Sequence, residues 1–187
     1  MFQRLFRERP AVAAGKALYT PLIEQARRPA FYVEGRVADT PNGRFELYSL
    51  HLALMVGRLR GSGAFAAEAS QALFDTFLAG LDDGLRELGV GDLTVPKKMR
   101  RLGEALYGRL KGYDAALAED APADALEAML GRTLYAGVEG APVDALAAYV
   151  RAAAAALAST PTEALLDGGP VPWPDFPGPE PKFETRS

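Results

Sequence analysis

Apolar residues recur at spacings of three and four along most of the chain, which is the periodicity of an α-helix that buries one face. The stripe within residues 18–26 predicts a first helix over residues 11–28, which ends before Pro29 because proline cannot continue a helix. From Arg44 to Leu59, apolar residues point almost all round the helix axis. This second pattern predicts a central buried helix.

The same periodicity continues through the second two thirds of the chain. Two long helices are expected, one from the Gly61–Gly63 break to about Leu88 and one from Pro96 to about Leu117. Two shorter helices are expected around residues 126–134 and 146–157. A last turn or two of helix is expected after the candidate capping box Thr160–Glu163. Together these patterns predict an all-α fold, a single compact domain of about six helices over residues 11–167.

Two segments interrupt the helical pattern. The aromatic stretch that begins at Phe31 and the turn-forming residues Asp39–Gly43 predict an extended segment and a turn, and a short hairpin over residues 31–43 is compatible with them. Residues 168–187 are rich in proline, which predicts a flexible, solvated C-terminal tail. Its alternative use is as a polyproline-type peptide with two aromatic anchors, Trp173 and Phe176.

The composition argues against most enzyme chemistries. Cysteine is absent, so the chain has no disulfide, no thiolate nucleophile and no cysteine metal site. Its one histidine, His51, excludes a multi-histidine metal site. We expect His51 to be a buried, hydrogen-bonded residue; the alternative is a haem ligand or general base with Met55 one turn away. We therefore predict no catalytic residue, metal site or cofactor.

Charge is unevenly distributed, although the net formal charge is only −3. Residues 1–30 carry +4, residues 31–111 carry +1 and residues 112–187 carry −8. Residues 1–10 mix arginines with Phe and Leu, which predicts a basic amphipathic segment able to touch a membrane. No stretch is long and apolar enough to span a membrane or to form a signal peptide, so we expect a cytoplasmic protein.

Four cations, Lys97, Lys98, Arg100 and Arg101, avoid the apolar stripe at the start of the helix that follows Pro96. We call these four residues the basic cluster. A solvated surface is the default interpretation of such a cluster, and RNA phosphates or anionic lipid headgroups are its two candidate ligands. Four charges without interleaved aromatic residues do not choose between them, and nothing in the sequence predicts DNA binding.

Two blocks of the sequence resemble a known protein family. The first, from about Tyr19 to His51, contains LYTPLIEQARRPAFY and DTPNGRFELYSLHL; the second, Leu73 to Leu117, contains LRELGVGDL and YGRLKGYDAAL. With their flanks they cover roughly residues 15–160 and resemble the ubiquinol–cytochrome c chaperones, assembly factors of the cytochrome bc1 complex. Gly80 departs from the acidic or bulky residue expected there, and the Pro-rich tail lies outside the resemblance.

The resemblance implies a non-enzymatic helical chaperone that binds newly made cytochrome b at the inner membrane, with the ribosome and a small partner protein as further candidate contacts. We expect Phe31 and Tyr32 to supply apolar partner contacts and the basic cluster to supply the electrostatic contact. The resemblance is concentrated in ten motif residues, each of which is either a contact or a scaffold residue: Arg44, Glu46, His51, Asp82, Arg86, Asp92, Tyr107, Arg109, Tyr113 and Asp114.

Two functions from other classes stay open beside the chaperone. One is a haem- or quinone-binding helical module built around His51 and Met55. The other is a ribosome- or RNA-associated factor that acts through the basic cluster.

Overall fold

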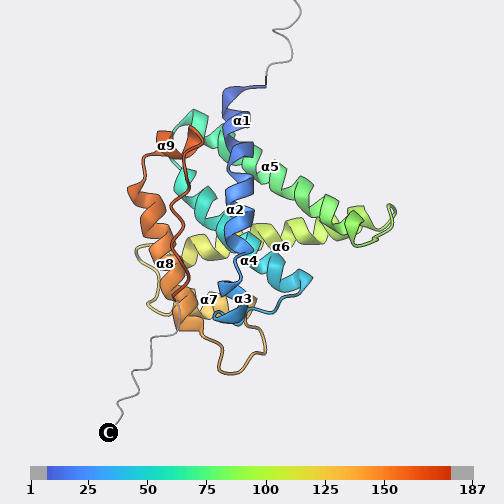
Figure 1. The fold of residues 1–187 in the computed structure, drawn as a ribbon, viewed down its shortest axis with the longest axis vertical. Coiled ribbons are helices and arrows are strands. Elements are labelled where there is room, and N and C mark those ends of the chain that lie inside the picture. Colours follow the sequence, from blue (N-terminus) through green and yellow to red (C-terminus); the bar gives the residue numbers. More distant parts are fainter. Residues whose placement is uncertain (1–7, 178–187) are drawn as a thin grey trace, which may run out of the picture.

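The computed structural model describes residues 8–177, which fold into one all-helical domain (Figure 1). The helices run in chain order as α1 (Pro10–Ala17), α2 (Tyr19–Ala26), α3 (Ala30–Val33), α4 (Pro41–Leu59), α5 (Ala64–Glu87), α6 (Val95–Ala116), α7 (Ala125–Thr133), α8 (Val143–Ser159) and α9 (Thr162–Leu166). This arrangement confirms the predicted fold class. Among the described residues, no helix is both long and apolar enough to cross a membrane.

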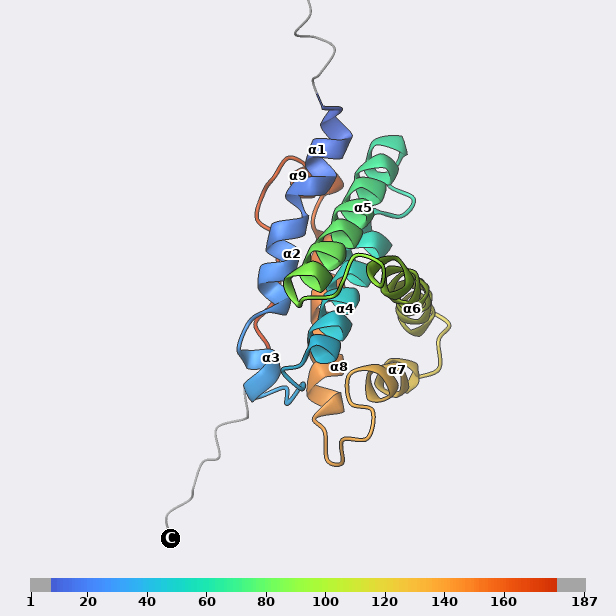
Figure 2. The ribbon, with the colours of Figure 1, turned by 90° about the vertical axis from the view of Figure 1, so that its right-hand side faces the viewer.

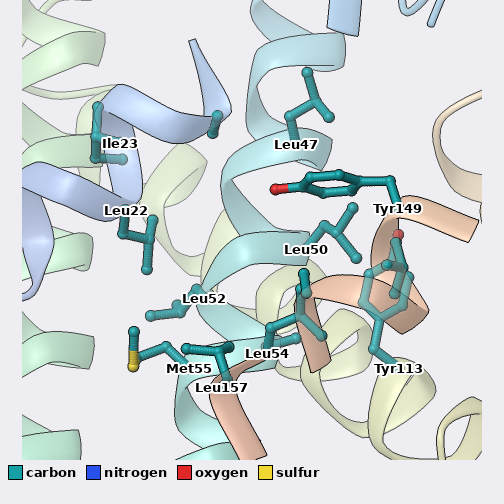
Figure 3. Packing of buried hydrophobic residues seen from close by; sticks show 14 of the residues in the cluster. Leu22, Ile23, Leu47, Leu50, Leu52, Leu54, Met55, Tyr113, Tyr149 and Leu157 are labelled. Atoms are coloured by element: carbon teal, nitrogen blue, oxygen red, sulfur yellow. The ribbon is translucent and has the colours of Figure 1, made fainter. Parts of the chain in front are cut away.

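Helix α4 lies at the centre of the domain, as its all-round apolar pattern predicts. Helices α2, α5, α6 and α8 all pack against it (Figure 2). Leu47, Leu50 and Met55 of α4 are fully buried and share one continuous core with Leu22 of α2 and Tyr149 of α8 (Figure 3). A helix with no solvated face draws its stability from these tertiary contacts rather than from helix propensity.

The first predicted helix is divided into two. Helix α1 ends at Ala17 and α2 begins at Tyr19, with Leu18 between them. Pro21 explains the break, because it has no N–H to donate to the carbonyl of Ala17 and its ring would collide with that carbonyl in a continuous helix. The buried side chain of Leu18 anchors the break in the core.

The hairpin expected over residues 31–43 is wrong. Residues 30–33 form the short helix α3, and the described part of the chain contains no strand. The Asp39–Gly43 sequence, interpreted as a turn, is instead the start of α4: Thr40 is the N-cap, and its Oγ1 accepts a hydrogen bond from the Gly43 N–H at 3.1 Å. Pro41 takes the first helical position, which its fixed φ favours.

The solvated tail is also wrong for residues 168–177, while residues 178–187 lie outside the described range. Phe176 is buried in the core, and its ring centroid is 5.4 Å from that of Phe31. The Gln25 side chain donates to the carbonyl of Pro174 at 3.1 Å, and Arg28 pairs with Asp175 at 2.6 Å. The two aromatic residues named as anchors for a partner therefore anchor the chain to itself. We call residues 171–177 the C-terminal strap.

Candidate client-binding groove

Helices α4, α5 and α6 enclose a surface groove of about 390 Å³. Its lining residues are mostly apolar: Pro41, Asn42, Phe45 and Glu46 of α4, Gly80, Leu81, Gly84 and Leu85 of α5 with Leu88 just beyond its end, and Leu102, Ala105 and Arg109 of α6. Its volume falls in the range of pockets that take several side chains or a small ligand. We call this site the α4–α6 groove.

Two glycines on one face of α5 shape this groove. A Cβ atom at Gly80 would lie 2.1 Å from the hydroxyl of Tyr19, so a larger residue there would have to displace the end of the Tyr19 side chain. A Cβ atom at Gly84, one turn later, would meet nothing within 4 Å. The missing side chain at Gly84 therefore leaves space in the groove, and the departure from the family pattern at Gly80 has a packing reason.

A buried ion pair borders the groove and joins two of the motif residues. Both carboxylate oxygens of Glu46 accept hydrogen bonds from Arg109, from Nε and Nη2, each at 2.7 Å. The Glu46 side chain is almost completely buried, while that of Arg109 is 29% exposed. The hydrogen bond to Glu46 raises the pKa of Arg109 above its usual value. This bidentate contact fixes α6 against α4 beside a mostly apolar lining.

Most other motif residues have structural partners. Arg86 pairs with Asp82 at 2.7 Å and also with Asp92, so it ties the end of α5 to the connector that follows. Arg44 pairs with Asp39 at 2.6 Å.

Three motif residues lie on α6. Tyr113 is fully buried, with its hydroxyl 3.0 Å from Oγ1 of Thr133, and Asp114 pairs with Arg60 of the α4–α5 connector. Tyr107 is exposed and borders a second groove of about 440 Å³ with Val56 among its other lining residues.

The two aromatic residues expected to contact a partner do not form a surface patch. Phe31 is completely buried and packs edge-on against His51, Tyr149 and Phe176. Its expected surface role is therefore wrong in this conformation. Tyr32 is half-buried, and its hydroxyl donates to the carbonyl of Ala26 at 3.1 Å. Partner binding by Tyr32 stays a prediction.

All four residues of the basic cluster are exposed, as expected from their positions off the apolar stripe. They lie on the first two turns of α6, beyond one end of the α4–α6 groove, in which Leu102 is the nearest lining residue along the helix. Arg100 faces Glu104 at a loose 3.9 Å. Their binding to a partner stays a prediction.

His51 is fully buried and both of its ring nitrogens are hydrogen-bonded. Nδ1 lies 2.8 Å from the carbonyl of Leu47, which can only accept, so Nδ1 carries the proton. Nε2 lies 2.7 Å from the hydroxyl of Tyr149 and therefore accepts from it. Burial lowers the pKa of His51 to about 4, so the ring is neutral at pH 7.

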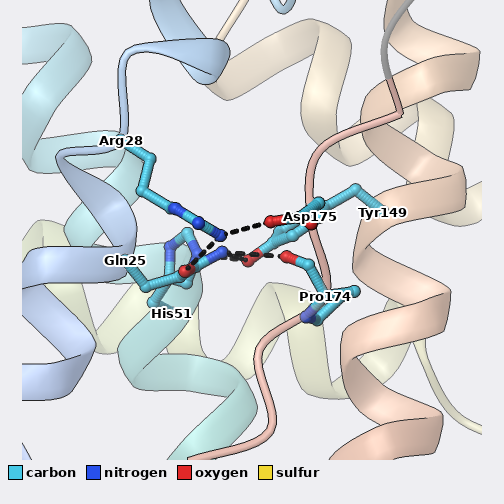
Figure 4. Close-up of polar contacts among 6 residues, drawn as sticks. All are labelled: Gln25, Arg28, His51, Tyr149, Pro174 and Asp175. Carbon is cyan, nitrogen blue, oxygen red and sulfur yellow. Dashed lines mark hydrogen bonds and ion pairs between the residues drawn. The ribbon is translucent and has the colours of Figure 1, made fainter.

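The hydrogen-bond chain extends beyond His51 to the C-terminal strap (Figure 4). Gln25 donates to the hydroxyl of Tyr149 at 3.0 Å and, with its second N–H, to the carbonyl of Pro174. The sequence pattern did not identify this hydrogen-bonded network, since nothing in local spacing links residues 25, 51 and 149. The Nε2 lone pair that a haem ligand needs is already used, so these residues do not fit a haem site.

The sequence pattern also did not identify the residues that line the α4–α6 groove as part of a surface site. Leu81, Leu85 and Leu102 belong to apolar stripes whose periodicity is that of core residues, so the pattern alone does not place them in a surface groove. The signal that distinguishes them is the pair of glycines four residues apart on the same face of α5. Glycine in a helix interior is unfavourable, so two of them on one face indicate a close approach or an open space.

Known proteins resemble this chain over most of its length. A family model described as "Ubiquinol-cytochrome C chaperone" matches residues 33–173. Ubiquinol-cytochrome-c reductase complex assembly factor 1 is 25% identical over 162 residues both in Xenopus laevis and in Mus musculus. The match covers 86% of this chain in each case, and 80% of the frog protein but 54% of the mouse protein.

A solved structure agrees with the family match. The crystal structure of the Cbp3 homolog from Brucella abortus has a TM-score of 0.80 and 37% sequence identity to this chain, and the match covers 94% of this chain and 98% of that one. The family model, moreover, spans the groove-forming helices α4, α5 and α6 completely. This chain therefore belongs to the ubiquinol-cytochrome C chaperone family.

Proposed function

We propose that this protein is a non-enzymatic assembly factor of ubiquinol-cytochrome c reductase, the cytochrome bc1 complex, and that it binds newly synthesised cytochrome b at the cytoplasmic face of the inner membrane. The observation that carries the proposal is the family match over residues 33–173. The names of the frog and mouse relatives, both assembly factors of ubiquinol-cytochrome c reductase, support the assignment to this complex.

The α4–α6 groove is our candidate for the client site. A membrane subunit outside the bilayer exposes apolar side chains that associate with one another in water, so a chaperone must offer them an alternative apolar surface. The groove provides one: Leu81, Leu85 and Leu102 line it, and Leu88, 67% exposed, extends it to the surface. Arg109, whose side chain is 29% exposed beside the groove, offers N–H donors to a backbone carbonyl of the client.

The non-enzymatic part of the proposal rests on the family description, which is that of a chaperone. The single histidine is buried, neutral and hydrogen-bonded through both nitrogens, so it is not available as a general base. Within residues 8–177, no three histidine or acidic side chains gather in a way that would hold a metal ion.

Filling the groove tests the proposal directly. Gly84→Leu adds a side chain at a position that lines the groove and where an added Cβ meets nothing within 4 Å, and it replaces a poor helix former by a good one. In cells that lack the gene, wild-type protein should restore the haem signals of cytochromes b and c1 in reduced-minus-oxidised spectra of the membranes. Gly84→Leu should fold but fail to restore them.

A matched control distinguishes blocked binding from general damage. Gly131→Leu in α7 makes the same change where an added Cβ also meets nothing within 4 Å, but Gly131 does not line the groove. It should restore the spectra. Full rescue by Gly84→Leu, or normal spectra in cells without the gene, would contradict the proposal.

Crosslinking identifies the client itself. A photoreactive side chain at Leu88, which is exposed and lines the groove, should capture cytochrome b. The same group at Val138, which is exposed on the α7–α8 connector, should not. Equal capture from both positions would mean that the groove is not the client site.

The exposed basic cluster supports a second candidate, association with ribosomal RNA or the ribosome during synthesis of the client. Phosphate contacts lose affinity steeply as salt rises, whereas an apolar client site does not. Ribosome binding that weakens with salt and is lost when the four cations are neutralised would establish this role beside the first.

A further inference from the structure

The connector between α5 and α6 lies at the edge of the molecule, away from the other helices (Figure 1). We call residues 88–101, which comprise this connector and the first two turns of α6, the α5–α6 tip. Leu88 is 67% exposed and Leu93 is 99% exposed. Single exposed leucines are common, but two on one short protruding segment form an apolar surface for which the described part of the chain provides no cover.

The basic cluster follows these leucines along the chain, on the first two turns of α6. Its four cations occupy the N-terminal end of α6, where the helix dipole disfavours positive charge, and the first turn of α6 contains no acidic residue. Among residues 8–177, no carboxylate lies within 4 Å of Lys97, Lys98 or Arg101, and Arg100 has only the loose contact with Glu104. The chain thus concentrates positive charge where its own backbone does not stabilise it.

Acidic neighbours only partly offset this charge. Asp92 lies in the connector but is already paired with Arg86, and Glu87 is exposed at the end of α5. Residues 86–101 contain five basic and two acidic residues, a formal charge of +3. The α5–α6 tip is therefore both apolar and positively charged.

We propose that the α5–α6 tip docks on an anionic phospholipid bilayer, with Leu88 and Leu93 at the boundary between headgroups and acyl chains and the basic cluster at the phosphates. This combination suits a lipid surface, because cations attract the headgroups and apolar side chains enter below them. RNA would engage the cations but leave two exposed leucines without a contact. The inference deepens the proposed function and rests on it for its setting at the inner membrane.

This docking also sets the position of the α4–α6 groove relative to the membrane. Leu88 belongs both to the α5–α6 tip and to the lining of the α4–α6 groove. With the tip on the bilayer, one end of the groove faces the membrane surface, where an apolar subunit is located before it joins its complex.

Vesicle binding tests the inference without any client. The full-length protein is floated with vesicles of phosphatidylcholine alone or of phosphatidylcholine with phosphatidylglycerol. It should bind the anionic vesicles and not the neutral ones. Leu93→Glu should weaken binding about tenfold or more, and Lys97→Gln with Lys98→Gln should weaken it by at least about tenfold.

Val33→Glu is the matched control, because Val33 is 70% exposed on α3 and the change in net charge is the same as in Leu93→Glu. It should bind almost as well as wild type. Equal weakening by the two substitutions, equal binding to both kinds of vesicle, or binding to RNA without binding to vesicles would overturn the inference. Such a result leaves the proposed function standing, since that is decided by the haem spectra of the Gly84→Leu strain.

Discussion

His51 links the stability of the domain to pH. Its pKa is about 4 in the fold, against 6.5 as the usual value, because burial disfavours the charged ring. As the pH falls, the unfolded chain takes up this proton first, so the stabilisation present above pH 6.5 is lost between pH 6.5 and 4. The loss amounts to about 3 kcal/mol in the free energy of unfolding.

Because the chain has one histidine, a single variant isolates this effect. Urea unfolding of wild type and His51→Gln over this pH range should give a smaller pH dependence for the variant, whose amide can still accept from Tyr149. Parallel curves for the two proteins would mean that His51 is not the titrating group.

The Glu46–Arg109 pair is expected to matter more for stability than any exposed pair. Arg109→Ala leaves the Glu46 carboxylate buried without its partner, which should lower the free energy of unfolding by about 2–3 kcal/mol. This is less than for a fully buried pair, because Arg109 is 29% exposed. Arg86→Ala, which removes two exposed ion pairs, should lower the melting temperature only slightly. Equal melting temperatures for the two variants would contradict this difference.

The C-terminal strap behaves as part of the core rather than as a tail. Phe176 packs against Phe31 and Tyr149, so Phe176→Ala should lower the free energy of unfolding by about 3 kcal/mol. Phe65→Ala, at a half-exposed position at the start of α5, should lower it by about 1 kcal/mol or less. Calorimetric melting of both variants measures the difference, and a negligible effect at Phe176 would mean that the strap is not docked in solution.

Helices with a strong periodicity of apolar residues could be predicted from the sequence. Segments whose conformation depends on tertiary contacts could not. Helices α4 to α8 follow from apolar spacing, and the starts of α6, α7 and α8 follow also from nearby prolines, because both signals are local. The sequence pattern predicts an extended segment for the residues of α3. It does not show that Phe31 is buried in the core, and this tertiary contact stabilises the short helix. The proline content of the strap predicts a solvated segment. It carries no information about the contacts with the distant Gln25 and Tyr149 that hold the strap in place.

The candidate site was predictable only in part for the same reason. The family resemblance identified Glu46 and Arg109 as motif residues, but their pairing joins positions 63 residues apart. The basic cluster could be assigned to the surface, because its residues avoid a helical stripe. The groove could not be recognised, since the leucines of a groove and those of a core have the same period.

The single tryptophan reports on whether the domain unfolds as one unit. Trp173 lies in the C-terminal strap and contacts His51, with ring centroids 5.1 Å apart. The strap, α2, α4 and α8 share one continuous core, so Trp173 fluorescence and helical circular dichroism should give coincident unfolding curves. A fluorescence transition at lower denaturant would show instead that the strap detaches before the helices unfold.

The position of the strap in the sequence sets the order in which the domain is completed during synthesis. Gln25 and Pro174 are 149 residues apart, and the strap leaves the ribosome only after all the helices it packs against. Until then the aromatic rings of Phe31 and Tyr149 lack their cover, and the long loop between the partners makes the closing contact slow to form. A nascent chain stalled before residue 171 should therefore lack the finished core, although most of its helices are already made.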